Sequence, residues 1–220
     1  MPRSVGRAFE LLERVVADGE TNLTTAAQRA GLTPTTALRH LRALEALGYV
    51  HRDHDGVYSA GPAVLRLAAA ARDDGPLARL VAAAQPVLDD LTAATGESSY
   101  LAVAESEQAV YLATSESARS IRHVGWVGRT VPLDGTAIGE ALRGAAGPQH
   151  RAGTIEPDIS AIAHAVTDGD EVVAALSVIG PTHRMDRAAV SAAGDSVRDA
   201  VAALSIALGF AAATSSREVS

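Results

Sequence analysis

Four side chains in one short stretch have the chemistry to contact DNA: Thr35, Thr36, Arg39 and Arg42. Hydroxyl and guanidinium groups bond to phosphates and to base edges, and an Arg can bond to a guanine through two donors at once. In a helix starting at Pro34, these side chains point away from its apolar stripe. The stretch therefore predicts a DNA-reading surface, and the structural alternative is a surface for protein contacts.

The helix that positions these side chains is predicted between Gly31 and Gly48. Thr33 is a hydroxyl N-cap, Pro34 fits the first helical position, and Gly48 ends the helix. Apolar residues recur at three- and four-residue spacing, at Ala37, Leu41, Leu44 and Leu47. This stripe takes the buried face and leaves the first turn and both arginines exposed.

The neighbouring segments complete a small domain. A helix capped by Thr24 or Thr25 and closed by Gly31 precedes the reading helix, which is a helix-turn-helix arrangement. The alternating segment around Asp55-Gly56 predicts a β-hairpin. A first helix brings Phe9 into the core, within an apolar set of Val5, Ala8, Phe9, Leu12, Val15 and Val16. We expect a winged helix.

These motifs resemble the IclR family of bacterial transcriptional regulators. The resemblance rests on Gly31-Leu32, Thr35-Thr36, Arg39, Leu41, Leu44, Gly48-Tyr49-Val50 and Tyr58, then on Gly128, Pro132-Leu133, Thr136, Ala137, Gly139 and the strand 172–181 that ends in Gly-Pro. It implies a two-domain α+β fold with a GAF-like mixed α/β effector domain. The expected parts are a winged helix-turn-helix DNA-binding domain (1–61), a linker helix (62–75), the effector-binding domain (76–214) and a disordered tail (215–220).

Other residues around the reading helix are predicted to contact DNA, namely Thr24, Thr33, Pro34, Arg52 and His54. His40 leaves two interpretations open, because it suits either a partly buried core position or a base contact. His51 and His54 have a spacing that can hold a metal on a helix, but on a strand entering a hairpin they do not converge. We therefore predict no metal site.

The net charge of −7 argues at first against a nucleic-acid partner. Up to Ala60, however, the chain has seven Arg and seven acidic residues, so the negative surplus lies downstream. All nineteen basic residues are Arg, and there is no Cys. This excludes a P-loop lysine, a Schiff-base lysine and thiol chemistry. Without a catalytic motif, signal peptide or spanning segment, we expect a cytoplasmic non-enzyme that needs no cofactor and has no membrane partner.

The second domain is predicted to have helices over Leu77 to Gly96 and Asp186 to Ala213, and strands over 99–104, 109–113 and 120–127. On a later strand, Ser160, Ile162, His164 and Val166 share one face. The resemblance implies that a small organic acid binds in this domain, at the positions of Val131, Ala137, Ile138, Ser160 and Ser177. Trp126, His164 and Ile179 are further candidates for effector contact. The structural alternatives are that Trp126 only packs and that the two serines bond to neighbouring backbone.

Two departures from the family pattern leave the function open. Ile179 stands where the family's Ser-x-Ser-Gly-Pro pattern has its second serine, and the segment 145–158 is a few tens of residues shorter than is usual. One hypothesis is a sequence-specific regulator, in particular a repressor, whose operator affinity a carboxylic acid changes. The other is a ligand-independent repressor with a vestigial pocket. Both imply a double-stranded DNA operator and a homodimer or homotetramer.

Overall fold

A computed structural model describes residues 3–210, without the side chains of Arg3 and of residues 71–74. The tail expected over 215–220 lies outside the described residues. The chain divides into two compact units between Ala78 and Arg79, and each is described by itself. No helix within residues 3–210 is long and apolar enough to cross a membrane.

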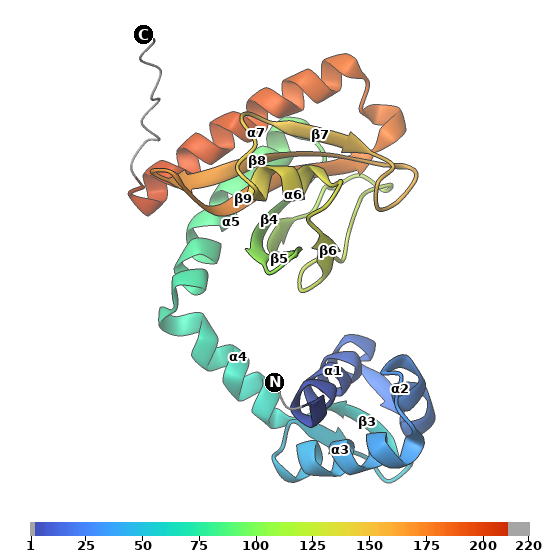
Figure 1. Ribbon diagram of the computed structural model, residues 1–220. Coiled ribbons are helices and arrows are strands. Elements are labelled where there is room, and N and C mark those ends of the chain that lie inside the picture. The colour runs from blue at the N-terminus through green and yellow to red at the C-terminus, as the bar shows by residue number, and fades with distance from the viewer. Residues whose placement is uncertain (1–2, 211–220) are drawn as a thin grey trace. The chain divides into compact units, whose positions relative to one another are not determined.

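Unit 1 is a three-helix core with a three-stranded antiparallel sheet, followed by a fourth helix (Figure 1). Its elements are α1 (Arg3–Asp18), β1 (Glu20–Asn22), α2 (Leu23–Arg29), α3 (Pro34–Ala46), β2 (Val50–Arg52), β3 (Val57–Ala60) and α4 (Pro62–Asp74). The strands lie in the order β1-β3-β2. The hairpin β2-β3 turns at Gly56, which has a φ of +82°. The predicted winged helix-turn-helix is confirmed.

Several details of unit 1 differ from the prediction. Asn22 caps α2 by accepting a bond from the amide of Thr25 at 2.9 Å, so neither threonine is the cap. Phe9 is 56% exposed and is not the core plug, since Leu11, Leu12 and Val15 fill that place. Leu47 is 65% exposed because α3 ends before it. Strand β1 was not predicted, since three residues carry too little alternating pattern.

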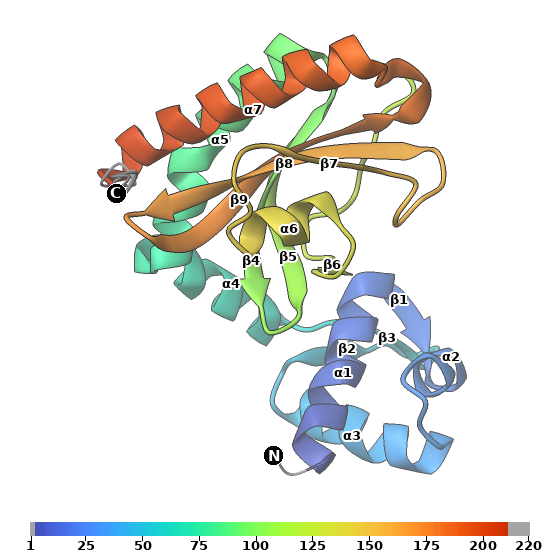
Figure 2. The ribbon, with the colours of Figure 1, turned by 45° about the horizontal axis from the view of Figure 1, so that its top comes forward.

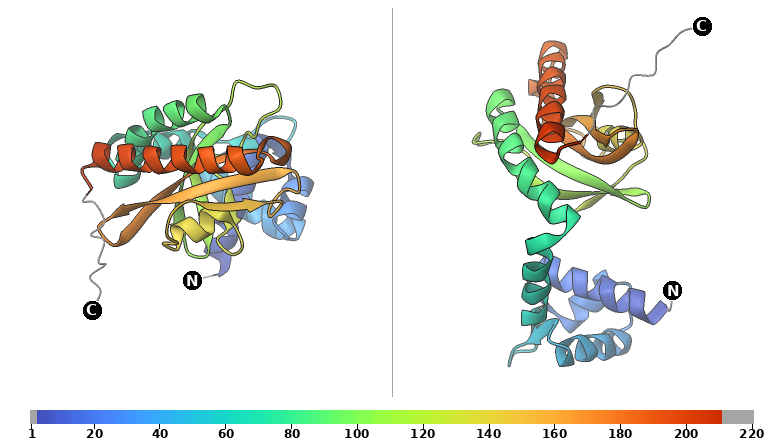
Figure 3. Two further views of the ribbon diagram at one scale, coloured as in Figure 1. Left: turned by 90° about the horizontal axis from the view of Figure 1, so that it is seen from above. Right: turned by 90° about the vertical axis from the view of Figure 1, so that its left-hand side faces the viewer.

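Unit 2 is a six-stranded antiparallel sheet with helices on both faces (Figures 2 and 3). Its elements are α5 (Pro76–Thr95), β4 (Ser98–Glu105), β5 (Gln108–Ser115), β6 (Thr130–Pro132), α6 (Ala137–Leu142), β7 (Gln149–Ala152), β8 (Ile159–Asp168), β9 (Glu171–Pro181), the 3-10 turn η1 (Thr182–Arg184) and α7 (Arg187–Leu208). The strand order is β6-β5-β4-β9-β8-β7. Helices α5 and α7 cover one face, and α6 covers the other.

Two predictions for unit 2 were wrong. Residues 120–127 form no strand but an irregular segment between β5 and β6. Helix α7 ends at Leu208 rather than at Ala213, because Gly209 takes a left-handed conformation with a φ of +71°. The other predicted strands and the helix over 77–96 agree with β4, β5 and α5.

Gly139 fixes the place of α6 against the turn that joins it to β6. A Cβ at this position would lie 1.8 Å from the carbonyl oxygen of Leu133, so no larger residue fits without moving the backbone. The hydroxyl of Thr136 caps the helix by accepting from the amide of Gly139 at 3.1 Å and donates to the carbonyl of Pro132 at 2.9 Å. The close approach and the cap together explain the Pro-Leu, Thr and Gly pattern of this segment.

We expect Gly139→Ala to destabilise unit 2 by about 1–3 kcal/mol or more, because the added Cβ overpacks against backbone. The matched control is Gly194→Ala in α7, where the added Cβ meets only the side chain of Pro148 at 3.6 Å. That variant should be neutral or more stable by about 0.5–1 kcal/mol. Urea unfolding followed by the fluorescence of Trp126 measures both, and equal stability of the two variants would contradict the packing argument.

Candidate functional site

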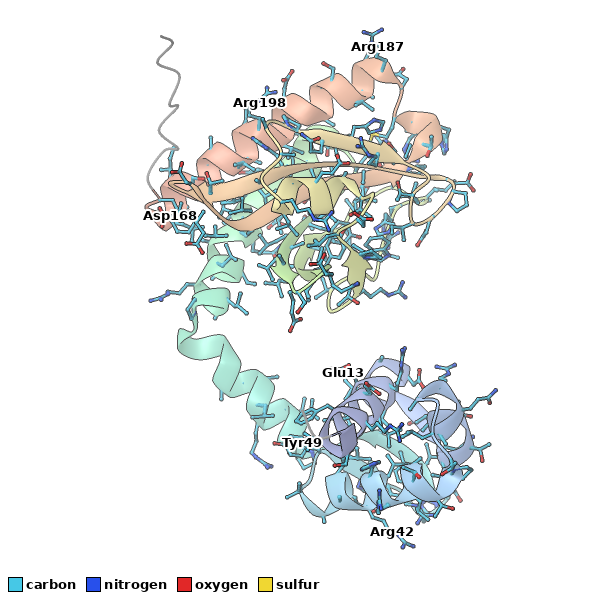
Figure 4. All side chains as sticks on the ribbon, in the orientation of Figure 1. Glu13, Arg42, Tyr49, Asp168, Arg187 and Arg198 are labelled. Atoms are coloured by element: carbon cyan, nitrogen blue, oxygen red, sulfur yellow. The ribbon has the colours of Figure 1, made fainter. Side chains whose placement is uncertain are left out.

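The exposed face of α3 carries the predicted reading residues. Thr35, Arg39 and Arg42 are exposed and follow one another at four- and three-residue spacing, so they form one stripe. Figure 4 shows Arg42 pointing away from the core of unit 1. Within the described residues, the side chains of Arg39 and Arg42 have no hydrogen bond or ion pair inside the chain. Both guanidinium groups are therefore available to a ligand.

The start of α3 is held by a pair of threonines. The Thr33 hydroxyl accepts from the amide of Thr36 at 3.3 Å and donates to its hydroxyl oxygen at 2.9 Å. Thr33, Pro34 and Thr35 are exposed, and Thr36 is half-buried. Thr33 is thus occupied by capping, which leaves Thr35 as the hydroxyl most available to DNA.

The hairpin places two further predicted contacts on the surface. Arg52 lies over the ring of Tyr58, with 5.5 Å from its guanidinium carbon to the ring centre, and remains exposed. His54 projects from the turn with its side chain 90% exposed. The carboxylate of Asp53 shapes the turn by accepting from the amides of Asp55 and Val57 at 3.0 and 2.8 Å. A hairpin of this shape can reach a phosphate or a minor groove.

His40 and Thr24 have different outcomes. His40 is only 8% exposed and lies on the buried side of α3, which agrees with the core interpretation and argues against a base contact. Thr24 is exposed near the start of α2.

A small cavity lies between α6, the sheet and the loop after β7. Five of the predicted effector residues line it, namely Trp126, Val131, Ala137, Ile138 and Ile179. The sequence analysis missed the rest of its lining, which comprises Tyr111, Thr136, Arg151, Thr154, Ile155, Glu156, Ile159 and Ala161. The cavity is thus mainly aromatic and aliphatic, with a few polar groups at its edge. Its one lining cation, Arg151, is paired with Glu140.

Three predicted effector residues do not line this cavity. Ser160 and His164 share a face of β8 with Ile162, which packs against α5 and α7, so they lie on the opposite face of the sheet. The hydroxyl of Ser160 is 2.7 Å from Nε2 of His150. Ser177 faces the α6 side, in register with Tyr100 and Ala163, but is completely buried outside the lining. Its hydroxyl has no hydrogen-bond partner among the described residues.

For the lining residues on β8, the sequence does contain a signal, which is the alternation of side chains between the two faces of the strand. Ile159 and Ala161 occupy the face opposite to Ser160, and the sequence alone does not say which face covers the cavity. For Thr154, Ile155 and Glu156 no periodic signal exists, because they lie on an irregular loop.

A buried polar network positions the wall that contains Trp126. The hydroxyl of Tyr100 lies 2.8 Å from Nδ1 of His123 and 3.1 Å from its carbonyl oxygen. Ser98 donates to the same carbonyl at 2.7 Å. The rings of His123 and Trp126 meet edge to face at 4.4 Å, and Trp126 packs likewise on Tyr111. Burial raises the pKa of Tyr100 to about 12, so its hydroxyl stays protonated.

The cavity is small, with a volume of about 40 Å³. Pockets that hold small molecules usually measure roughly 300–1,000 Å³. Residues 153–158 are exposed and connect β7 to β8, so they are the part of the wall that can move outward most easily. The cavity as it stands holds water but not an aromatic acid. Within residues 3–210, no group of three His, Asp or Glu side chains could hold a metal ion.

Comparisons with known proteins match both units. Residues 4–54 match the model of the IclR helix-turn-helix domain, and residues 77–156 match that of the bacterial transcriptional regulator IclR C-terminal domain. The transcriptional regulator BhcR of Paracoccus denitrificans is 28% identical over 244 residues, which cover 92% of this chain and 86% of BhcR. That length exceeds this chain's 220 residues, so BhcR has residues that this chain lacks.

Solved structures share the fold. An IclR transcriptional regulator from Alicyclobacillus acidocaldarius superposes with a TM-score of 0.75 and 24% identity, covering 94% of this chain and 99% of that one. An IclR homologue from Microbacterium hydrocarbonoxydans, solved in complex with 4-hydroxybenzoate, superposes with a TM-score of 0.74 and 20% identity, with the same coverage.

We expect unit 2 to lose stability as the pH falls below about 6.5. Burial lowers the pKa of His123, His150 and His164, so the folded state keeps them neutral while the unfolded chain takes up protons. The variant His164→Gln should lose less stability than the wild type between about pH 7.5 and 5.5. Urea midpoints read by Trp126 fluorescence measure this.

The control for that experiment is His183→Gln, which removes an exposed histidine from the same unit. It should follow the wild-type profile. A wild-type midpoint that does not change over this pH range would contradict the prediction.

Proposed function

The chain belongs to the IclR family of bacterial transcriptional regulators, and we propose that it is a cytoplasmic repressor that binds a two-fold DNA operator. It is a DNA-binding transcriptional regulator and not an enzyme. The observation that carries the proposal is the exposed stripe of Thr35, Arg39 and Arg42 on α3. In a helix-turn-helix, the second helix enters the major groove, where an Arg can bond to guanine through two donors.

The proposed operator contact combines α3 with the hairpin. Arg39 and Arg42 supply cations on α3, and Arg52 with His54 supplies contacts from β2 and the turn. In this assignment Arg39 reads a base, because it lies one turn after Thr35 near the start of the helix, where recognition helices contact base edges. Arg52 and His54 bind phosphates, which fix the orientation of the domain without reading sequence.

A homodimer or homotetramer gives the operator its two-fold symmetry. Apolar side chains on one face of α1 support this part of the proposal, since Val5, Phe9 and Val16 are 41%, 56% and 40% exposed. They follow one another at four- and seven-residue spacing, so they lie together. A second copy that pairs on this face would bury them, and two recognition helices would then reach successive major grooves.

We further propose that a small organic acid bound in the cavity under α6 changes the affinity for DNA. The complex of 4-hydroxybenzoate with the Microbacterium homologue supports an acid of this kind. Tyr111 and Trp126 would pack against an aromatic or aliphatic body, and Arg151 would bind the carboxylate after leaving Glu140. Because the cavity has a volume of only about 40 Å³, binding requires residues 153–158 to move outward.

The small cavity also favours a second candidate function. With a volume of about 40 Å³ and a wall formed by Thr154, Ile155 and Glu156, the cavity suits a vestigial pocket. The chain would then repress without a ligand. The two candidates share the DNA site and differ in one observable, which is whether any small acid changes DNA affinity.

We expect Arg39→Ala to weaken specific DNA binding by about 1–3 kcal/mol, because a bidentate base contact is lost. Fluorescence anisotropy on a fragment from the region upstream of its own gene, in competition with random DNA, measures the loss. Arg66→Ala, which removes an exposed arginine of α4, is the control and should bind as the wild type does. An equal loss on random DNA would overturn the assignment of Arg39 as a base-reading residue.

We expect Ala161→Leu to abolish the response of DNA binding to small acids without changing the affinity for DNA. The larger side chain fills the cavity, since Ala161 is part of its lining. The assay is the same titration with 4-hydroxybenzoate and related acids, and Ala202→Leu on the exposed side of α7 is the control. A full response in Ala161→Leu would contradict the proposed site, whereas no response in the wild type would favour the vestigial pocket.

A further inference from the structure

A second and larger cavity lies between the end of α5 and the start of α7, with a volume of about 240 Å³. Its charged wall consists of Glu97, Arg119 and Arg184, and its apolar wall includes Met185, Ala189 and Ala192. None of these residues lines the cavity under α6. The function proposed above makes no use of this second cavity.

The charged wall carries a net positive charge. The carboxylate of Glu97 is 5% exposed and accepts three bonds, from Nη1 of Arg119 at 2.6 Å and from Nε and Nη2 of Arg184 at 2.6 and 2.7 Å. One carboxylate therefore faces two guanidinium groups. In the part of the chain that the structure describes, neither arginine has an ion pair with any other acid.

The cluster is built into the fold through two glycines. A Cβ at Gly180 would lie 2.7 Å from Oε2 of Glu97, and a Cβ at Gly96 would lie 2.7 Å from Nη2 of Arg119. Gly96 also has a φ of +70°, which disfavours any larger residue. The backbone thus leaves room for the two arginines and for the carboxylate that holds them.

Donors remain free on both arginines that line the cavity. The side chain of Arg119 is 48% exposed, and that of Arg184 is 22% exposed. Each guanidinium carries five N–H groups, so the bonds to Glu97, together with the bond from Arg184 to the carbonyl of Ile121, leave Nη1 of Arg184 and most N–H groups of Arg119 unused. Such donors bind the two oxygens of a carboxylate side by side. The alanines of α7 and Met185 present a short apolar surface next to them.

We propose that Arg119 and Arg184 bind the carboxylate of a small aliphatic monoanion, whose carbon chain packs on Met185 and the alanines of α7. The single excess positive charge matches one carboxylate. The volume of about 240 Å³ exceeds that of a 150 Å³ cavity known to hold a benzene molecule, so a short carbon chain fits. This site is separate from the cavity under α6 and does not depend on the effector proposed there.

The site is mechanically connected to Trp126. Arg184 donates from Nη2 to the carbonyl of Ile121 at 2.9 Å, and Arg119 lies on the same irregular segment, seven residues before Trp126. An anion that binds to these guanidinium groups changes the hydrogen bonds that position this segment. Because Trp126 is the only tryptophan of the chain, its fluorescence reports the binding.

The test is a titration of the full chain with butyrate, followed by Trp126 fluorescence and by calorimetry. We expect saturable binding with a Kd of about 1 mM or tighter. Arg119→Gln should weaken it at least about tenfold, which corresponds to about 1.4 kcal/mol. Ala192→Leu keeps both arginines but fills the apolar side, and it should weaken binding as well.

Two variants are expected to bind butyrate as the wild type does. Arg187→Gln removes an exposed arginine at the start of α7 (Figure 4) that does not line the cavity. Ala161→Leu blocks only the cavity under α6. Inorganic phosphate is the competing probe, and it should bind more weakly than butyrate because it has no carbon chain.

Three results would overturn the proposal. They are the absence of saturable butyrate binding, equal affinity in the wild type and in both Arg119→Gln and Ala192→Leu, and phosphate binding as tight as that of butyrate. The last result would mean that the site binds oxyanions in general and is not specific for a carboxylate.

Discussion

The burial of Ala37, Leu41 and Leu44 against the other helices of unit 1 fixes the rotation of α3, and the proposed DNA-reading surface depends on that rotation. A helix has only one rotation that buries this stripe, and that rotation directs Thr35, Arg39 and Arg42 to the solvent. The cap formed by Thr33 and Pro34 fixes where the helix begins, and so which residues lie in its first turn. The exposure of the proposed reading residues thus follows from packing inside unit 1.

In unit 2 the equivalent constraint is the alternation of the sheet. One face of the sheet packs against α5 and α7, and the other packs against α6. Because side chains alternate between the two faces along a strand, a shift of one position decides whether a residue can contact a ligand under α6. The irregular segment between β5 and β6 contributes to the walls of both cavities, through Trp126 in the cavity under α6 and through Arg119 in the second cavity, and polar bonds hold this segment. Tyr100 and Ser98 hold the segment with His123, while Glu97 holds it through Arg119. Strand residues line only the cavity under α6, whereas the second cavity lies between these polar residues and the helices α5 and α7.

The sequence was sufficient where a local rule decides the structure. The N-cap Thr33, Pro34 and the terminating Gly48 predicted α3, and the Asp55-Gly56 turn predicted the hairpin. The Pro-Leu pair and the following Gly predicted α6. It was insufficient where a distant partner decides. The local sequence does not reveal that Ser160 and His164 lie on the face covered by α5 and α7, or that Phe9 lies outside the core. It also does not reveal that residues 154–156 close a cavity. The ion pairs of Glu97 join residues up to 87 positions apart, so no motif reveals them.

One measurement tests the central claim most directly, and it is a titration of the wild-type protein on DNA from its own upstream region at several salt concentrations. If α3 reads bases, the protein binds this DNA far more tightly than random DNA of the same length. The affinity for both falls with salt, because arginines release counterions from phosphates, but the difference between them persists. Equal binding to the two DNAs at every salt concentration, or no binding to either, would contradict the account.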